Sequence, residues 1–201
     1  MMRKTMIFKD ITTDTENTYT LKENERCLFF MLNRSGEIRF ELAGSGAEAH
    51  IFAFFIGKGA DAATLKTSQI HSAPRTLSQA LIKSVLFDAA VFTYDGLIHI
   101  EKNAPQTDAS QESRALLLSP RAQAFAKPTL EILANDVKCR HAATVSPLDA
   151  EQLFFAQSRG LSHQQAEQLL IRGFFKDALE KMADLGADTS EISRNIATQL
   201  Q

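Results

Sequence analysis

One cysteine and one histidine stand two residues apart in the second half of the chain. Cys139 and His141 lie in residues 137–145, a stretch with several β-branched residues and no helix signal. If this stretch is extended, alternate side chains point to one face, so the thiol and the imidazole project together with their Cα atoms about 7 Å apart. A soft sulfur ligand beside an imidazole predicts a site for a metal ion or cluster.

Other interpretations of the pair stay open on the residues alone. Cys139 is equally typical of a small buried thiol that fills a strand, and His141 of a structural histidine where a strand meets a helix. A Cys-His hydrolase with Cys139 as nucleophile is a third hypothesis. It needs an accessible thiolate and an orienting third residue, and two positions on one strand are an unusual place for a nucleophile and its base.

The remaining polar candidates have simpler explanations. His71 precedes Ser-Ala-Pro and is predicted to lie in a turn, and Cys27 lies in an apolar run that predicts a core position. Ser158 and Arg159 fit the last turn of a helix, where a cation is favourable near unpaired carbonyls. The other histidines, which have no supporting neighbours in the sequence, are His50, His99 and His163.

Helix signals begin directly after the Cys-His stretch. Ser146 is predicted as an N-cap, Pro147 as the first helical residue and Asp149 as an early carboxylate. Gly160 is placed to end this helix, and Ser162 begins a capping-box pattern for a second one. The chain therefore changes from extended to helical structure at about residue 147.

The second helix carries one apolar stripe. Gly173 interrupts it at a cost of about 1 kcal/mol relative to alanine, which predicts a close helix contact or a kink. Gly186 is expected to end this helix, and Thr189 or Ser190 to start a last one. The stripe packs on the preceding structure or is offered to another protein; it consists of Ala166, Leu169, Leu170, Phe174, Ala178, Met182 and Leu185.

Before residue 147 the pattern is that of many short strands. Apolar runs and alternating segments occur at 27–32, 38–42, 47–56, 63–71, 82–86, 89–94, 97–101, 116–118 and 130–132. Such a series predicts a sheet that is stacked, wrapped or closed on itself. No fixed sequence period is detectable, so the residues do not choose between a sandwich, a barrel and a solenoid.

Composition excludes several classes of protein. The 201 residues are 44% hydrophobic, enough for one good core, and a net charge of −2 gives no reason to expect nucleic acid. Residues 1–4 are basic, but no apolar segment follows them, so neither a secretory signal nor a membrane span is expected. Two distant cysteines indicate free thiols in a reducing cytoplasm.

Several blocks in one order resemble the SufB/SufD family of iron-sulfur cluster assembly scaffolds. The C-terminal signature is Asp-Val-Lys-Cys-x-His-x-Ala-Thr-Val at 136–145, followed by Asp-x-Glu-Gln-Leu-Phe at 149–154 and Ser-Arg-Gly-Leu at 158–161. Further blocks lie upstream, and together they cover residues 67–179. The upstream blocks are His-Ser-Ala-Pro-Arg-Thr at 71–76, Leu-Phe-Asp-Ala-Ala at 86–90, Gly-Leu-Ile at 96–98, Ala-Leu-Leu-Leu-Ser at 115–119 and Pro-Thr-Leu-Glu-Ile at 128–132.

The resemblance implies a fold, a site and partners. It implies a mainly β chain with a right-handed parallel β-helix, or solenoid, as its core and a C-terminal α-helical region. His141, with Cys139, would be a ligand for iron or a transient iron-sulfur cluster at the interface with a SufB-like subunit or a second copy of the chain. A SufC-type ABC ATPase would dock on the C-terminal helices, since this chain has no Gly-x-x-x-x-Gly-Lys phosphate loop.

Departures from the family place the chain nearer to SufD. Ala142 stands where glycine is usual, Phe155 stands where tyrosine is usual, and Ser113 is the nearest equivalent of a cysteine that the SufB branch carries one coil upstream. We therefore predict a non-catalytic, SufD-like scaffold with an N-terminal arm or first strand (1–24), a β-helix core (25–146) and a helical region (147–201). The alternative is an interaction module or degenerate paralogue without a cluster role.

Overall fold

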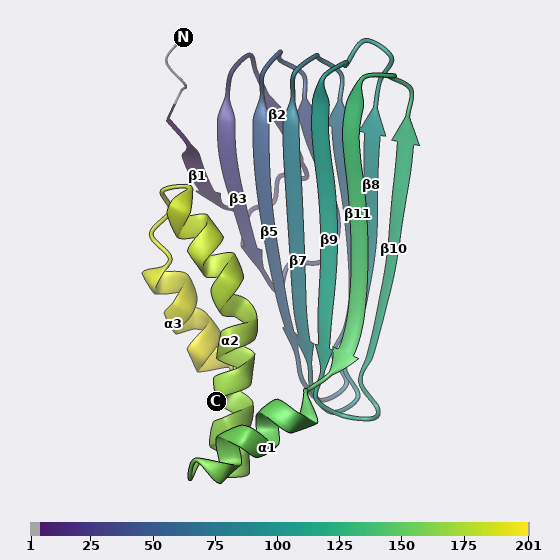
Figure 1. Cartoon of the computed structure of the whole chain (residues 1–201). Coiled ribbons are helices and arrows are strands. Elements are labelled where there is room, and N and C mark those ends of the chain that lie inside the picture. The colour runs from purple at the N-terminus through teal and green to yellow at the C-terminus, as the bar shows by residue number, and fades with distance from the viewer. Residues whose placement is uncertain (1–4, 201) are drawn as a thin grey trace.

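The computed structural model describes residues 5–200, which form a parallel β-solenoid followed by three helices (Figure 1). The strands are β1 (Ile7–Asp10), β2 (Thr18–Leu21), β3 (Arg26–Leu32), β4 (Gly36–Leu42), β5 (Glu48–Gly57), β6 (Ala62–His71), β7 (Leu77–Leu86), β8 (Val91–Ile100), β9 (Thr107–Leu117), β10 (Gln123–Ile132) and β11 (Val137–Pro147). The helices are α1 (Ala150–Ser158), α2 (His163–Asp184) and α3 (Ser190–Gln199).

Successive strands alternate between two sheets. Sheet A has the order β1-β3-β5-β7-β9-β11, sheet B has the order β10-β8-β6-β4-β2, and the strand pairs are parallel. The chain coils with a right hand from β1 to β11, and the two sheets face each other across a thin core (Figure 1). This arrangement confirms the predicted solenoid, because each strand pairs with the strand one coil away and not with its sequence neighbour.

The length of a coil changes along the chain. Ile7 pairs with Cys27, a separation of 20 residues, whereas Glu48 pairs with Leu77, a separation of 29 residues. The early strands are shorter and the later corners longer, so no single sequence period exists. This is the physical reason why periodicity alone did not identify the solenoid.

Left-handed residues at the corners let the coils stack. Gly46, Arg75 and Gln106 have φ of 72°, 59° and 61°. The backbone N–H of Gly46 donates to the Pro74 carbonyl at 3.1 Å, and that of Arg75 donates to the Pro105 carbonyl at 2.9 Å. Each corner is thus joined to the next coil by the backbone, which compensates the strain of a left-handed non-glycine residue.

The first coils enclose an aromatic core. Tyr19, Phe29 and Phe40 are buried together, with the Phe29 and Phe40 ring centroids 4.9 Å apart. Cys27 has no exposed surface, which confirms its predicted core position, and burial raises its pKa to about 11. This thiol is therefore a packing group.

The helices cover the outer face of sheet A (Figure 1). Phe175 of α2 packs against Phe54 of β5 with 4.9 Å between ring centroids, and Ile171 is buried beside it. The predicted stripe packs on the sheet, but its membership is partly wrong: Leu169 is 53% exposed, whereas Ile171 and Phe175 are buried. Contact with sheet A determines which face of α2 is buried. The residues of α2 on this face are Ile171, Phe175, Ala178 and Met182.

A buried lysine ties α2 to the sheet. Lys83 of β7 is 1% exposed; its ammonium donates to the Asp177 carboxylate and to the Phe174 carbonyl, and lies 4.5 Å from the Phe174 ring centroid. Asp177 also pairs with Arg114 of β9 at 3.4 Å. Burial lowers the Lys83 pKa, and hydrogen bonding to Asp177 partly opposes that shift. An unpaired charge here would be costly, so the ion pair fixes where α2 sits.

The start of α1 differs from the prediction. Ser146 and Pro147 are the last residues of β11, and Asp149 is the N-cap, with its carboxylate accepting from two backbone N–H groups of the first turn. Pairing with β9 keeps the strand extended through Pro147, so the helix starts at the next strong cap. Gly160 and Gly186 end their helices with φ of 94° and 95°, as predicted.

Two strands that the sequence predicts form a single strand in the structure. Residues 89–94 and 97–101 were expected to be separate, but β8 runs through Gly96 without a break. A side chain on Gly96 would point into the core and collide with the Gln111 amide and the Tyr94 hydroxyl. The absence of a side chain at Gly96 therefore leaves room for its two larger neighbours, and the glycine does not mark a turn.

Gly173 lies within a continuous helix. The predicted close contact is wrong, because a Cβ at Gly173 would meet nothing within 4 Å.

The sequence-based expectation of no secretory signal rests on the basic residues 1–4, which lie outside the described residues. Within 5–200, no helix is both long enough and apolar enough to cross a membrane.

His71 is a core residue, which corrects its assignment to a turn. It ends β6 with no exposed surface, and its ring nitrogens lie 2.7 Å from the Thr76 hydroxyl and 2.8 Å from the Ser78 hydroxyl. Burial lowers its pKa from 6.5 to about 4. The imidazole is held neutral because both of its nitrogens already have neutral partners.

We predict that His71 makes the fold less stable in mild acid. The unfolded chain takes up a proton on this histidine near pH 6.5 and the folded chain only near pH 4, so stability is full above 6.5 and falls as the pH drops through that window, by about 3 kcal/mol in all. Urea unfolding from pH 7 to 4.5 should show this slope, and His71→Gln should reduce it. The exposed control His163→Gln should leave the slope unchanged. Equal slopes in the wild type and both variants would show that His71 is not the group responsible.

We predict opposite effects for two glycine-to-alanine changes. A Cβ on Gly44 would overlap the backbone of Lys22 and Glu23, so Gly44→Ala should cost about 3 kcal/mol or more. Gly173→Ala adds a methyl group in open space within a helix and should stabilise by about 1 kcal/mol. Urea denaturation of the two variants measures both effects, and a neutral Gly44→Ala would show that the corner can relax.

Candidate functional site

Strand β11 forms one edge of sheet A at the end of the solenoid. It pairs with β9, and its register places Cys139 beside Ala109 and His141 beside Gln111. Ala109 and Gln111 are both buried on the inner side of sheet A. Cys139 and His141 therefore share the inward row of the last coil, as alternation along a strand requires.

Within residues 5–200, no further coil stacks on the last one, so this inward row is open to solvent. His141 is exposed, whereas Cys139 is half-buried against a small cluster that includes Ile98 and Ala109. Burial is the main cause that raises the Cys139 pKa, and the Arg140 backbone N–H opposes it. At neutral pH the thiol is protonated, and a metal would have to displace that proton.

The row beneath His141 becomes more polar from coil to coil. The register aligns Phe29, Ile51, Ala80, Gln111 and His141 in one line across sheet A. The line thus runs from an aromatic core at one end of the solenoid to an imidazole at the other. The hydrophobic effect holds the first coils together, and hydrogen bonds take over towards the open end.

A buried polar chain lies directly behind the site. Gln111 is 1% exposed and donates to the Gly96 carbonyl at 3.0 Å; the Tyr94 hydroxyl lies 3.5 Å from its amide oxygen and 2.9 Å from the Thr67 hydroxyl. Sequence reasoning missed Gln111 and Tyr94. The usable signal was Gly96, since a glycine inside a strand often marks a close approach by a neighbour.

Two ligands are too few for a metal site within one chain. Among residues 5–200, no three His, Cys, Asp or Glu side chains converge closely enough to hold an ion. The chemistry of the thiol and the imidazole suits iron or zinc, and both groups are accessible from the open end. A metal bound here would need further ligands from another molecule.

The hydrolase hypothesis fits this geometry poorly. A nucleophilic cysteine needs a lowered pKa, but burial raises that of Cys139. The nearest charged pair, Arg140 with Asp108 at 3.2 Å, lies on the opposite, outward face of the sheet. No orienting carboxylate therefore joins the two side chains in the part of the chain that the structure describes.

The other histidines lie away from the open end of the core. They have carboxylate neighbours that sequence reasoning did not find: His50 with Glu48 at 4.0 Å, His99 with Glu131 at 3.0 Å and His163 with Glu167 at 3.7 Å. Each neighbour is a glutamate, either across adjacent strands, two residues back on one strand or one helical turn away. His50 is buried on a central strand and the other two histidines are more exposed, and none of these pairs adds a ligand to the site.

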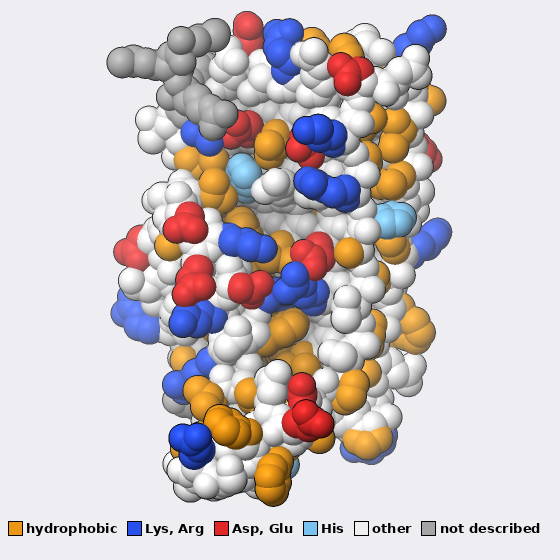
Figure 2. Space-filling model, viewed as in Figure 1, with side chains coloured by type: hydrophobic (Ala, Val, Ile, Leu, Met, Phe, Trp, Pro, Cys, Tyr) orange, Lys and Arg blue, Asp and Glu red, His pale blue; other side chains and the backbone are white. Residues whose placement is uncertain are grey.

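Helix α1 exposes large apolar side chains. Phe154 is 73% exposed and Phe155 59% exposed, and Leu169 of α2 borders the same hollow as Phe155. Apolar side chains gather over α1 at the lower end of the molecule, and charges of both signs mix over the middle of this face (Figure 2). Arg159, predicted to be structural, lies over the Phe155 ring with 4.8 Å to its centroid. Such an apolar group on a small protein marks an interaction surface.

The fold and the site define a class of protein: a β-solenoid that opens a thiol and an imidazole at its last coil and has an apolar helical surface beside it. Comparison with known proteins assigns the family. The family described as "SUF system FeS cluster assembly, SufBD core domain" matches residues 31–174, and the chain belongs to this SufB/SufD family.

The individual relatives include proteins named SufD and SufB. The chain is 37% identical over 117 residues to the iron-sulfur cluster assembly protein SufD of Escherichia coli, covering 58% of this chain and 28% of that protein. It is 38% identical over 122 residues to the chloroplastic protein ABCI7 of Arabidopsis thaliana (58% and 26%), and 32% identical over 152 residues to SufD of Bacillus subtilis (76% and 35%). The matched part thus spans between a quarter and about a third of these relatives.

We predict that Cys139 reacts slowly with alkylating agents. Its raised pKa leaves little thiolate at pH 7.5, so carbamidomethylation followed by site-resolved mass spectrometry should give a rate below that of free cysteine. Buried Cys27 should react more slowly still. A Cys139 rate above that of free cysteine would show an activated nucleophile and would restore the hydrolase hypothesis.

Proposed function

We propose that this chain is a SufD-like, non-catalytic scaffold subunit that helps to hold iron or a nascent iron-sulfur cluster where it meets a second subunit. The observation that carries the proposal is the position of Cys139 and His141 on the inward row of the open last coil. Membership of the iron-sulfur assembly family supports iron or a cluster as the cargo, and the open end is where we propose that it is held.

The end of the solenoid is suited to a second polypeptide. β10 and β11 are the edge strands there, 10 and 11 residues long, and no strand of the described chain pairs with the outer side of either. Ile132 and Val145 of these strands are 41% and 45% exposed. Unpaired edges of this length normally need a cover. A SufB-like subunit, or a second copy of this chain, would supply the cover and the missing ligands.

The donor set suits iron as a transient cargo. A neutral imidazole and a thiolate are both good ligands for iron, and binding would release the thiol proton. Because burial raises the Cys139 pKa, that release carries a free-energy cost. His141, which is exposed, would make the first contact, and Cys139 would join once a partner has closed the site.

A separate ATPase would supply the energy. We assign docking of a SufC-type ATPase to the apolar surface formed by Phe154, Phe155 and Leu169, beside the junction of β11 and α1. Motion of α1 would then be transmitted directly to the strand that carries the ligand pair, since β11 ends at Pro147 and α1 begins at Ala150. The two free cysteines suit a reducing compartment such as the cytoplasm.

We predict that His141→Ala abolishes cluster assembly and leaves the fold intact. The side chain is exposed, so its removal should change the free energy of unfolding by less than about 0.5 kcal/mol. Complementation of a strain that lacks its SufD measures the effect, and circular dichroism checks the fold. His163→Ala, which changes another exposed histidine, should complement normally. Normal assembly with His141→Ala would remove this residue from the mechanism.

The alternative is an interaction module, or a degenerate paralogue, without a metal role. Anaerobic reconstitution of the complex with iron and sulfide, followed by ultraviolet-visible absorption, separates the two. The scaffold function predicts charge-transfer bands that His141→Ala weakens. Identical bands in the variant, together with normal subunit association, would favour the interaction module.

A further inference from the structure

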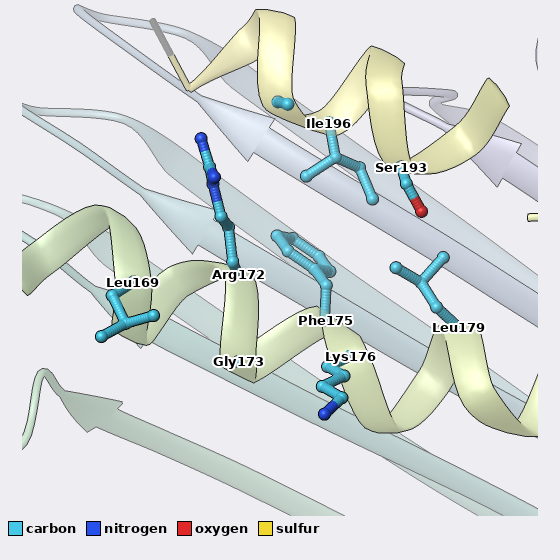
Figure 3. Close-up of a pocket in the computed structure, with 9 residues that line it drawn as sticks. Leu169, Arg172, Gly173, Phe175, Lys176, Leu179, Ser193 and Ile196 are labelled. Atoms are coloured by element: carbon cyan, nitrogen blue, oxygen red, sulfur yellow. The ribbon is translucent and has the colours of Figure 1, made fainter. Parts of the chain in front are cut away.

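Helices α2 and α3 leave a hollow of about 410 Å³ between them on the side away from sheet A (Figure 3). It is separate from the Cys-His pair at the end of the solenoid. Its size is within the range of small-ligand sites, near the lower end. The lining residues are Leu169, Arg172, Gly173, Phe175, Lys176, Leu179, Ser193, Ile196 and Ala197.

The walls of the hollow are apolar. Phe175 and Leu179 project from α2 towards α3, where Ile196 faces them (Figure 3). Phe175 and Ile196 are almost fully buried, because they also belong to the core between the helices and sheet A. The floor is therefore held by the folded core and does not depend on a ligand to form.

Gly173 adds room to the hollow at the edge of α2 that lies away from α3 (Figure 3). A Cβ at this position would meet nothing within 4 Å, and the residue lines the space beside Phe175. Glycine costs about 1 kcal/mol here relative to alanine, and neither a turn, a left-handed conformation nor a close helix contact explains it. The space left by the missing side chain belongs to the hollow.

One cation at this space has no hydrogen-bond or ion-pair partner among the described residues. Arg172 rises from α2 towards α3 beside Ile196 (Figure 3), and within residues 5–200 its side chain makes no hydrogen bond or ion pair. Lys176 projects to the other side of α2 and pairs with Glu180 at 3.5 Å. None of the lining residues is acidic, so the guanidinium has no counter-charge within the hollow.

We propose that this hollow binds a small amphiphilic carboxylate, with the acyl chain against Phe175, Leu179 and Ile196 and the carboxylate on Arg172. A planar guanidinium and a carboxylate form two parallel hydrogen bonds, which a neutral head group cannot reproduce. The volume accommodates a short or medium acyl chain. The inference does not depend on the proposed cluster role.

Octanoate is the probe, titrated into the full-length protein and followed by backbone-amide NMR shifts. Saturable shifts confined to α2 and α3 are expected. Arg172→Gln should weaken binding about tenfold, the loss of one charge-assisted contact. Gly173→Leu should fill the hollow and abolish binding, and thermal unfolding shows whether that variant is folded.

Arg194→Gln is the control, because it removes an exposed cation from α3 that does not line the hollow. It should bind octanoate within twofold of the wild type. Octylamine, with the same chain and the opposite charge, should not bind. Shifts spread over the solenoid, absence of octanoate binding, or unchanged affinity in folded Gly173→Leu would each overturn the proposal.

Discussion

The parallel pairing of β11 with β9 is the interaction on which the rest of the site depends. It fixes which side chains of the last strand face the core, and it keeps the chain extended through Pro147 until a helix can begin at Ala150. A shift by one residue would turn Cys139 and His141 to the opposite face of the sheet and bring Arg140 inward. The register of β11 on β9 therefore decides which side chains form the site, and buried residues of β9 maintain this register.

In a solenoid, only the two ends can expose inward-facing side chains to solvent. Each coil is buried by its neighbours, so the ends remain the places where inward-facing side chains meet solvent. Here the interior changes from Phe29 to Gln111 before it reaches His141, and the hydroxyls of Thr67 and Tyr94 extend this polar part into the core. The polar residues of the preceding coils therefore form the floor of the open end.

The helices add a second layer with two distinct faces. The inner face of α2 is fixed by Phe175 and by the ion pair of buried Lys83 with Asp177, so its orientation on sheet A is set by packing and charge together. The outer surface carries Phe154, Phe155 and the hollow beside Gly173, which the fold itself does not fill. Rigid attachment on one side is what lets the other side serve as a recognition surface.

The sequence by itself determined the local features of this protein. Alternation along a strand placed Cys139 and His141 on one face, the glycines at 160 and 186 and the capping box at Ser162 set helix ends, and ordered motifs identified the family and hence the solenoid. These features depend on residues close in the chain, or on blocks that can be matched directly.

Only the tertiary structure decided the rest, because those features join residues that are distant in sequence. His71 became a buried group between Leu42 and Ile100 on the adjacent strands of sheet B. Gly96 left room for Gln111, and contact with sheet A buried Ile171 and not Leu169. Whether Cys139 and His141 are open or enclosed was likewise set by the position of their strand in the stack. Local pattern specifies direction along a strand or helix, but burial is a property of what lies beside it.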